Sequence, residues 1–259
     1  MAVTEQPVVV RTRLGGRNLR TDRWWLPPLV TVVILAGFIG YGTWVAFANN
    51  DYYVDPYLSP FYSPCLADNC DHKTWNIIGD WWGLSPALLI LPFPLLFRLT
   101  CYYYRKAYYR SFMWSPPACA VPDKLSRYRG ESRFPLILQN AHRYFFYLAL
   151  PFPLILLWDA IKAFDFGGEF GMGLGTLILL VNAVLLGTYT LSCHSCRHLC
   201  GGHLNSFSQA PVRYRLWKGV TRLNTRHMEI AWVSLFGVLI SDLYVRLLAN
   251  NVFDDPRFF

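Results

Sequence analysis

One short segment, residues 191–203, holds the densest group of metal-binding side chains in the chain. It reads Leu-Ser-Cys-His-Ser-Cys-Arg-His-Leu-Cys-Gly-Gly-His. The ligand-type residues in it are Cys193, Cys196, Cys200, His194, His198 and His203. Thiolate and imidazole together favour zinc, an iron–sulfur cluster or another transition metal over magnesium or calcium. The segment is therefore a candidate metal centre, and the alternative is that its cysteines are simply small apolar residues.

The composition predicts which elements must position this segment. Of the 259 residues, 54% are hydrophobic and only 15% are charged, whereas about 25% charged is usual for soluble domains. A membrane-spanning helix needs about 20 mainly apolar residues. Five segments meet this condition, at approximately 25–48, 76–98, 143–162, 171–193 and 228–249. We predict an all-α polytopic membrane protein with a five-helix bundle over residues 25–250, preceded by a basic segment, 1–24, and followed by a tail, 251–259.

The distribution of positive charge predicts the orientation in the plasma membrane. The formal net charge is +8, and most of the 24 Lys and Arg residues precede the first span or lie in the links between spans two and three and between spans four and five. The positive-inside rule places these segments and the N-terminus in the cytoplasm. Such basic segments can contact anionic membrane lipids or dock a soluble partner. Because the mixed Tyr and Arg residues at 102–110 adjoin a span, we expect an interfacial collar and no nucleic-acid partner.

Two features on the outer side are expected to be structural. Cys65 and Cys70 lie five residues apart in a loop that faces an oxidising compartment, which predicts a disulfide. The alternative is a metal site that includes His72. Asp242 and Arg246 lie one turn apart in the last span, and this spacing predicts a self-neutralising ion pair.

The positions of the histidines restrict the choice of cofactor. Five of the six are predicted on the cytoplasmic side: His142, His194, His198, His203 and His227. Spans one and two contain no histidine, which argues against a two-haem chain across the membrane, since such a chain needs histidine pairs at two depths. A single haem b on the cytoplasmic side, with axial ligands among His142, His198 and His227, remains an alternative.

Helical geometry indicates that segment 191–203 cannot supply all the ligands alone. At about 100° per residue, His194 and His198 share one face and the three cysteines form another stripe. If the helix continues to Gly201, other elements must contribute. Three residues on the same side of the membrane are available: Cys101, Cys119 and His142. Two imidazoles and two thiolates match a Rieske-type [2Fe–2S] cluster, and a structural zinc ion accepts the same set.

Several longer strings resemble one family. They are residues 101–110 (CYYYRKAYYR), 115–119 (SPPAC), 134–144 (FPLILQNAHRY), 193–198 (CHSCRH) and 226–229 (RHME). Over roughly residues 25–250, the chain resembles the membrane-anchor subunit of actinobacterial-type succinate dehydrogenase, respiratory complex II. The resemblance implies a five-helix anchor that docks the flavoprotein and iron–sulfur subunits on the cytoplasmic face. It also implies electron transfer to menaquinone through a Rieske-type [2Fe–2S] cluster in place of haem b.

The resemblance also implies site residues, although this chain lacks the two separate Cys-x-His and Cys-x-x-His boxes of Rieske proteins. The predicted ligands are Cys119 and Cys193 on one iron and His194 and His198 on the other. Cys101, Cys196, Cys200 and His142 are the reserve ligands. The predicted quinone contacts are Tyr102, Arg105, His142 and Tyr144. Succinate oxidation is expected on a partner subunit, because this chain has no dinucleotide fingerprint and no soluble domain large enough for a flavin. The rival hypotheses are a haem b anchor of the same complex and a non-redox membrane protein with a structural zinc site.

Overall fold

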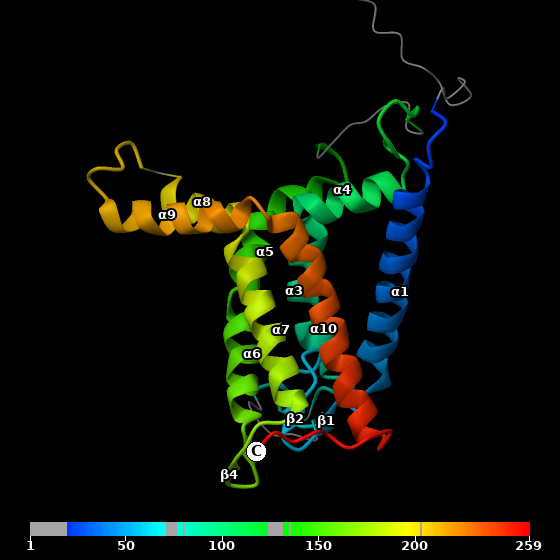
Figure 1. The fold of residues 1–259 in the computed structure, drawn as a ribbon, viewed down its shortest axis with the longest axis vertical. Helices are drawn as coiled ribbons and strands as arrows, with labels where there is room; N and C mark the ends of the chain where they lie inside the picture. The colour runs from blue at the N-terminus through cyan, green and yellow to red at the C-terminus, as the bar shows by residue number, and fades with distance from the viewer. Residues whose placement is uncertain (1–19, 71–76, 80, 124–131, 135, 203) are drawn as a thin grey trace, which may run out of the picture.

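The computed structural model describes residues 20–70, 77–79, 81–123, 132–134, 136–202 and 204–259, and they form an elongated helical bundle (Figure 1). At one end, three helices lie across the bundle: α4 (Tyr102–Ser111), α8 (His194–Gly201) and α9 (Pro211–Asn224). We call this the α8 end. Two short hairpins and the C-terminus lie at the opposite end, which we call the β1 end.

Four helical segments of the described chain are long and apolar enough to cross a membrane. They are α1 (Leu26–Ala48), residues Leu136–Lys162, α7 (Leu174–Leu191) and α10 (His227–Ala249). The second of these contains the 3-10 helix η2 (Leu136–Ala141), α5 (His142–Ala149) and α6 (Pro151–Lys162). Large apolar side chains such as Val33, Leu154 and Val184 point outward from the bundle. Outward apolar faces suit a lipid environment, and the prediction of a polytopic helical membrane protein is confirmed.

The second predicted span, 76–98, is wrong in its first half. Within the described residues of this segment, helix forms only at α2 (Ala87–Ile90) and α3 (Pro92–Thr100), which contain four and nine residues. Before them, the backbone N–H groups of Ile77 and Ile78 donate to the carbonyl of Leu66, at 3.1 and 3.0 Å. These bonds tie Ile77 and Ile78 to the preceding loop, so the two residues do not belong to a helix.

The helix that carries the cysteine-rich segment is also interrupted. α7 ends at Leu191, and Cys193 has an extended backbone conformation, with φ −64° and ψ 146°. The Sγ atom of Cys193 accepts a hydrogen bond from the N–H of Ser195 at 3.4 Å and so caps α8. The helix considered as continuing to Gly201 is thus broken at Cys193, because the Cys193 side chain offers the backbone an alternative partner.

The basic link after α8 contains a helix, α9, that the sequence analysis did not predict. It packs against α8 through a hydrogen bond from Arg197 Nε to Thr221 Oγ1 at 3.1 Å. The guanidinium of Arg197 also lies 5.1 Å from the centre of the Trp217 ring. Asn224 Nδ2 donates to the carbonyl of Ser192 at 2.7 Å, which fixes α9 beneath the α7–α8 junction.

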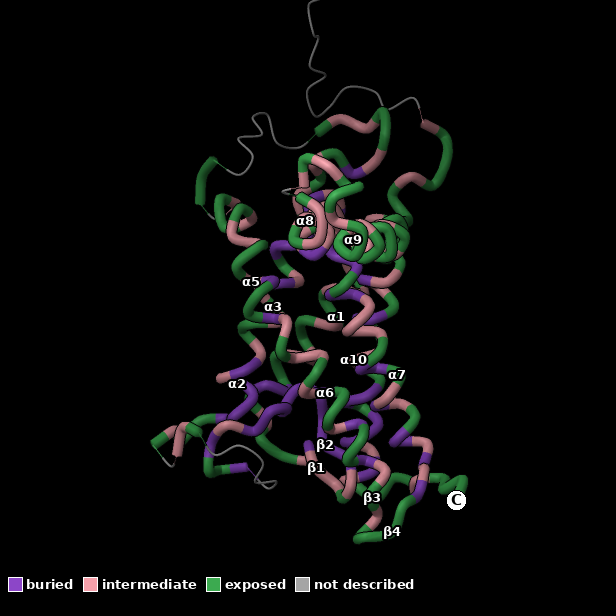
Figure 2. The backbone as a smooth tube through the Cα atoms, turned by 90° about the vertical axis from the view of Figure 1, so that its left-hand side faces the viewer, coloured by how far each residue is buried: buried purple, intermediate pink, exposed green. Residues whose placement is uncertain are grey.

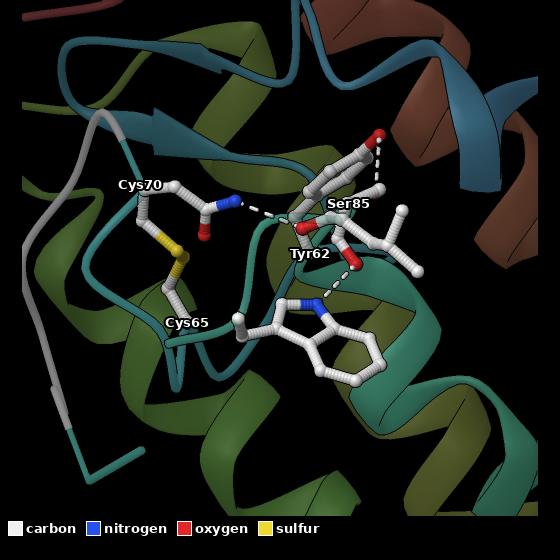
Figure 3. The surroundings of a disulfide bond; sticks show 7 residues. Tyr62, Cys65, Cys70 and Ser85 are labelled. Carbon is white, nitrogen blue, oxygen red and sulfur yellow. Dashed lines mark hydrogen bonds between the residues drawn. A yellow bond between two sulfur atoms is a disulfide. The ribbon is translucent and has the colours of Figure 1, made fainter. Parts of the chain in front are cut away.

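Short hairpins and a disulfide close the β1 end. Strands β1 (Tyr53–Val54) and β2 (Tyr57–Leu58) pair antiparallel, as do β3 (Asp165–Phe166) and β4 (Glu169–Phe170). Cys65 and Cys70 are joined by a disulfide beside Tyr62 and Ser85 (Figure 3). Both cysteines are buried, so the bridge fixes a loop that covers the apolar interior at this end.

The ion pair expected in the last span is present and buried. Arg246 Nε lies 3.0 Å from Asp242 Oδ2. Tyr41 Oη donates to the same carboxylate at 2.5 Å, and Arg246 Nη1 donates to the carbonyl of Asn50 at 2.8 Å. These contacts join α1 to α10 near the β1 end.

Buried residues gather beneath α8 and around β1 and β2 (Figure 2). The cluster beneath α8 consists of Phe97, Cys101, Tyr104, Phe146, Ala149, Tyr189, Cys193, Cys196, Ala231 and Leu235. It draws residues from α3, α4, α5, α7, α8 and α10. Two cysteines of this cluster, Cys101 and Cys193, also line the candidate site.

Candidate functional site

A cavity of about 270 Å³ opens at the α8 end of the bundle. Its lining residues are Thr100, Cys101, Tyr102, Arg105, Gln139, Asn140, His142, Cys193, His194 and His227. They come from the α3–α4 junction, the η2–α5 junction, the α7–α8 junction and the start of α10. Four helix boundaries therefore meet here, and two histidines and two cysteines face one another.

The first cysteine–histidine pair joins α5 to the α7–α8 junction. His142 Nε2 lies 3.1 Å from Cys193 Sγ, and His142 Nδ1 lies 2.8 Å from Thr100 Oγ1. The single hydroxyl proton of Thr100 is donated to the carbonyl of Leu96 at 2.7 Å. Thr100 must then accept from Nδ1–H, which leaves the lone pair of the neutral ring on Nε2. His142 therefore presents a metal-binding nitrogen towards a thiol.

The second pair repeats this arrangement with different residues. His227 Nε2 lies 3.5 Å from Cys101 Sγ, and His227 Nδ1 lies 2.6 Å from Ser192 Oγ. The hydroxyl of Ser192 donates to the carbonyl of Tyr189 at 2.9 Å, so it accepts from the ring N–H. His227 Nε2 consequently carries a lone pair that faces Cys101.

Each histidine is held in place by an aromatic ring as well as by a hydroxyl group. Phe97 stacks on His142, with ring centres 5.1 Å apart and an interplanar angle of 11°. Tyr189 stacks on His227 at 5.1 Å and 3°. Histidines that bind metals characteristically donate their second ring N–H to a fixed acceptor. The two rings here have that support, and their orientation is fixed by packing.

Burial keeps the thiols of the site protonated in the absence of a cation. Burial raises the pKa of the Cys101 thiol and raises that of Cys193 to about 11, because a thiolate loses its hydration in the interior. A bound metal ion reverses this preference, since its charge stabilises the thiolate. Loss of hydration and the nearby charge of Arg197 lower the pKa of His194.

The structure does not bring all the predicted ligands together. Cys193 and His194 line the cavity, but Cys119 and His198 are not among its lining residues. Cys119 is exposed in the loop after α4, where its carbonyl accepts a hydrogen bond from Arg20 Nη1 at 2.7 Å. His198 lies in the second turn of α8 and is not a lining residue of the cavity.

The reserve ligands divide in the same way. Cys101 and His142 line the cavity, whereas Cys196 and Cys200 lie on α8 outside it. Burial and the neighbouring Cys200 raise the pKa of Cys196 to about 12. His72 and His203 fall outside the described residues.

From the sequence, His227 was only a candidate haem ligand, and the hydroxyl groups of Thr100 and Ser192 were not expected at the site. The available signal for His227 was its position at the start of the last span, on the same side as the cysteine-rich segment. No local pattern marked Thr100 or Ser192, because each acts through a histidine that is distant in sequence.

The predicted quinone contacts lie in two environments. Tyr102 and Arg105 line the open side of the cavity together with His194, and His142 lies inside it. Tyr144 is 69% exposed on the outer surface of α5 and is not a lining residue. A second hollow of about 290 Å³ adjoins the cavity and shares Tyr102 and Arg105 with it.

In the described part of the chain, no group of three or more His, Cys, Asp or Glu residues is arranged to hold a single metal ion. The arrangement instead consists of two separate pairs, each with one thiol and one imidazole. Of the described residues that line the cavity, none is acidic. The site thus offers soft sulfur and nitrogen donors in a buried setting.

The fold and the site define a polytopic helical membrane protein with a cysteine–histidine centre at one end of its bundle. The family model for actinobacterial succinate dehydrogenase subunit SdhC matches residues 26–251. The chain belongs to this family, and it is a membrane-anchor subunit of a succinate dehydrogenase complex.

A solved structure supports the same assignment. The chain is 50% identical to a chain of the "Mycobacterium smegmatis Sdh1 complex in the apo form", with a TM-score of 0.87 and 97% of each chain covered. The search of curated proteins found no match. Other Sdh subunits are therefore the expected partners, and in the family's role this chain does not contain the catalytic site.

Proposed function

We propose that this subunit passes electrons from the iron–sulfur subunit of the complex to a quinone through a [2Fe–2S] cluster held in the cavity at the α8 end. The observation that carries the proposal is the pair of histidines whose Nε2 lone pairs face two buried thiols. The flavoprotein subunit would oxidise succinate, and this chain would anchor both soluble subunits to the membrane. Menaquinone is the quinone implied by the resemblance to the family.

The geometry favours Cys101, Cys193, His142 and His227 as the ligands. These four side chains form the two facing pairs, whereas Cys119 and His198 lie outside the cavity. A [2Fe–2S] cluster needs two protein ligands on each iron, and two histidines on one iron give the Rieske type, with a raised reduction potential. When bound, such a cluster exchanges one electron at a time. His194 lines the cavity but has no comparable contact with a thiol, so we assign it to the quinone side.

Quinone would bind at the open side of the cavity, against Tyr102, Arg105 and His194. Tyr102 is 52% exposed and lies over Arg105, whose guanidinium carbon is 5.3 Å from the centre of its ring. A guanidinium can donate hydrogen bonds to a quinone carbonyl, and His194 or Tyr102 can supply a proton when the quinone is reduced. The outward position of Tyr144 removes it from this site and gives it a lipid-facing role.

We further propose five passes through the plasma membrane, with the N-terminus and the α8 end in the cytoplasm. Helices α2 and α3 return the chain from the β1 end to the α8 end (Figure 1), which supports a fifth pass shorter than the others. The basic residues of α4 and α9 and the described N-terminal Arg20 and Arg23 belong to the α8 end. Their charge would favour the cytoplasmic leaflet and its anionic lipids.

The proposal is tested by low-temperature electron paramagnetic resonance of the purified complex after reduction with dithionite, together with an optical spectrum and an iron and zinc count. We expect a [2Fe–2S] signal with the low average g value of histidine ligation, in addition to the signals of the iron–sulfur subunit. Haem bands without that signal would favour a haem b anchor. If the complex contains zinc, and the iron–sulfur subunit accounts for all of its iron, the result would favour a structural zinc site.

A further inference from the structure

A half-buried, positively charged side chain lies beside this centre. Arg98, on α3, donates from Nη1 to the hydroxyl of Tyr104 and to the carbonyl of Ala231, the latter at 3.3 Å. Its Nη2 donates to Ser234 Oγ at 3.1 Å. Among the described residues, no Asp or Glu forms an ion pair with it. Its hydrogen-bond partners are neutral, so the charge of Arg98 remains uncompensated within the described chain.

An uncompensated charge in a membrane interior is costly and usually has a function. Tyr104 fixes the position of the Arg98 guanidinium, because the Tyr104 hydroxyl accepts a hydrogen bond from Arg98 and donates one to the carbonyl of Ala231 at 2.6 Å. The guanidinium is thus held between α3, α4 and α10. This rigid support places the charge at a defined position relative to the candidate ligands.

A stack of three side chains connects Arg98 to one of those ligands. The guanidinium carbon of Arg98 lies 4.6 Å from the centre of the Tyr189 ring. Tyr189 also stacks on His227, whose ring centre lies 5.1 Å away with an interplanar angle of 3°. His227 in turn faces Cys101. The Arg98 guanidinium therefore lies one aromatic ring away from the candidate ligand His227, and the Arg98 carbonyl accepts a hydrogen bond from the N–H of Cys101 at 3.1 Å.

We infer that Arg98 is a positioning residue whose charge, held behind Tyr189, raises the reduction potential of the cluster proposed above. The inference rests on the proposed function. One-electron reduction adds one negative charge to the centre, and a fixed positive charge nearby stabilises the reduced form. Partial burial of the guanidinium strengthens this effect, because the effective dielectric constant there is below that of water. Net charge around the cluster is one of the factors that set such potentials.

The test is a redox titration of the purified complex, followed by the paramagnetic resonance signal of the cluster at one fixed, neutral pH. Arg98→Gln removes the charge but keeps a polar side chain that can still reach Tyr104 or Ser234. We expect the equilibrium constant for reduction to fall on the order of tenfold, which corresponds to a midpoint lower by about 59 mV for one electron. Arg98→Lys retains the charge, so its midpoint potential should lie close to that of the wild type.

The matched control is Ser234→Ala, which deletes one hydrogen bond to Arg98 and leaves the charge in place. We expect its midpoint to remain close to that of the wild type, which separates charge from structural support. If the complex that carries Arg98→Gln does not assemble, the redox titration uses Arg98→Met instead. Methionine matches the apolar stem of the arginine side chain, and the same change in midpoint is expected.

An unchanged midpoint in the charge-removing variant, with the cluster signal intact, would overturn the role of Arg98 and leave the cluster proposal standing. A midpoint lowered equally in Arg98→Lys would also overturn it, since the charge would then not be the cause. A wild-type complex without the histidine-type signal overturns the cluster, and this inference with it.

Discussion

Cys101 and His227 are 126 residues apart in sequence, yet the Sγ of one lies 3.5 Å from the Nε2 of the other. The pair His142 and Cys193 approaches even more closely, at 3.1 Å. In both pairs, the second ring nitrogen donates to a hydroxyl whose own proton is already engaged. The candidate site is thus two copies of one arrangement, built from four separate helix boundaries.

The first prediction concerns the ligands. His227→Ala and Cys101→Ser should each remove the histidine-type cluster signal and abolish quinone reduction, because each deletes a donor. Succinate oxidation with an artificial soluble acceptor should persist, since that reaction takes place on a partner subunit. The measurements are paramagnetic resonance and both assays on the purified complex.

The control variants for this prediction are His198→Ala and Cys119→Ser, which change the same residue types outside the cavity. Both should keep the signal. Loss of the signal in the controls and its retention in the cavity variants would restore the ligand set inferred from sequence alone.

The second prediction concerns the hydroxyl groups that orient the histidines. Thr100→Val and Ser192→Ala leave the ring N–H of His142 and His227, respectively, without its acceptor. Loss of such an acceptor typically weakens metal binding about 10–100-fold. We expect the cluster to be lost faster on exposure to a chelator, as followed by the decay of its signal.

The comparison for this experiment is Thr188→Ala, because Thr188 is a half-exposed residue of α7 whose hydroxyl bonds only to the carbonyl of Val184 in its own helix. It should lose the cluster at the wild-type rate. Equal rates in all three variants would mean that these hydroxyl groups do not support the histidines.

The third prediction concerns thiol reactivity. Burial and Cys200 raise the pKa of Cys196 to about 12, so at mildly alkaline pH almost none of it is thiolate, the form that reacts. Cys119 is exposed and should be alkylated first in the detergent-solubilised protein. The labelling of Cys196 should rise with pH, about tenfold per unit, until the pH approaches its pKa. Mass spectrometry of peptides from the wild type and from Cys119→Ala measures both rates, and equal rates at the two sites would contradict the buried position of Cys196.

The fourth prediction concerns stability at the β1 end. Asp242→Asn leaves the buried guanidinium of Arg246 without its carboxylate partner. Breaking one side of a buried ion pair typically costs about 3–5 kcal/mol, so the thermal unfolding temperature of the purified complex should fall. Asp254→Asn makes the same chemical change at an exposed position and should have little effect. A similar unfolding temperature in both variants would mean that the Asp242–Arg246 pair contributes little to stability.

The sequence alone determined the class of protein and the four long spans. Predicted bounds of 25–48 and 228–249 agree with Leu26–Ala48 and His227–Ala249 to within one residue. The physical reason is local: about 20 consecutive apolar residues form a membrane-spanning helix whatever surrounds them. The Cys65–Cys70 pairing and the Asp242–Arg246 pair were also predictable, because each depends on two residues close together in sequence.

Only the tertiary structure decided the composition of the site and the bounds of the irregular elements. Segment 77–86 has the composition of a span, but the hydrogen bonds of Ile77 and Ile78 to the preceding loop keep these two residues out of a helix. Helical geometry indicated that the motif at 193–200 needs ligands from other elements, and the break at Cys193 turns that residue towards His142. Cys101 and His227 joined the site because α3, α7 and α10 pack together at one end of the bundle. Sequence spacing within one segment carries no information on such packing, so the two facing pairs emerged only from the three-dimensional arrangement.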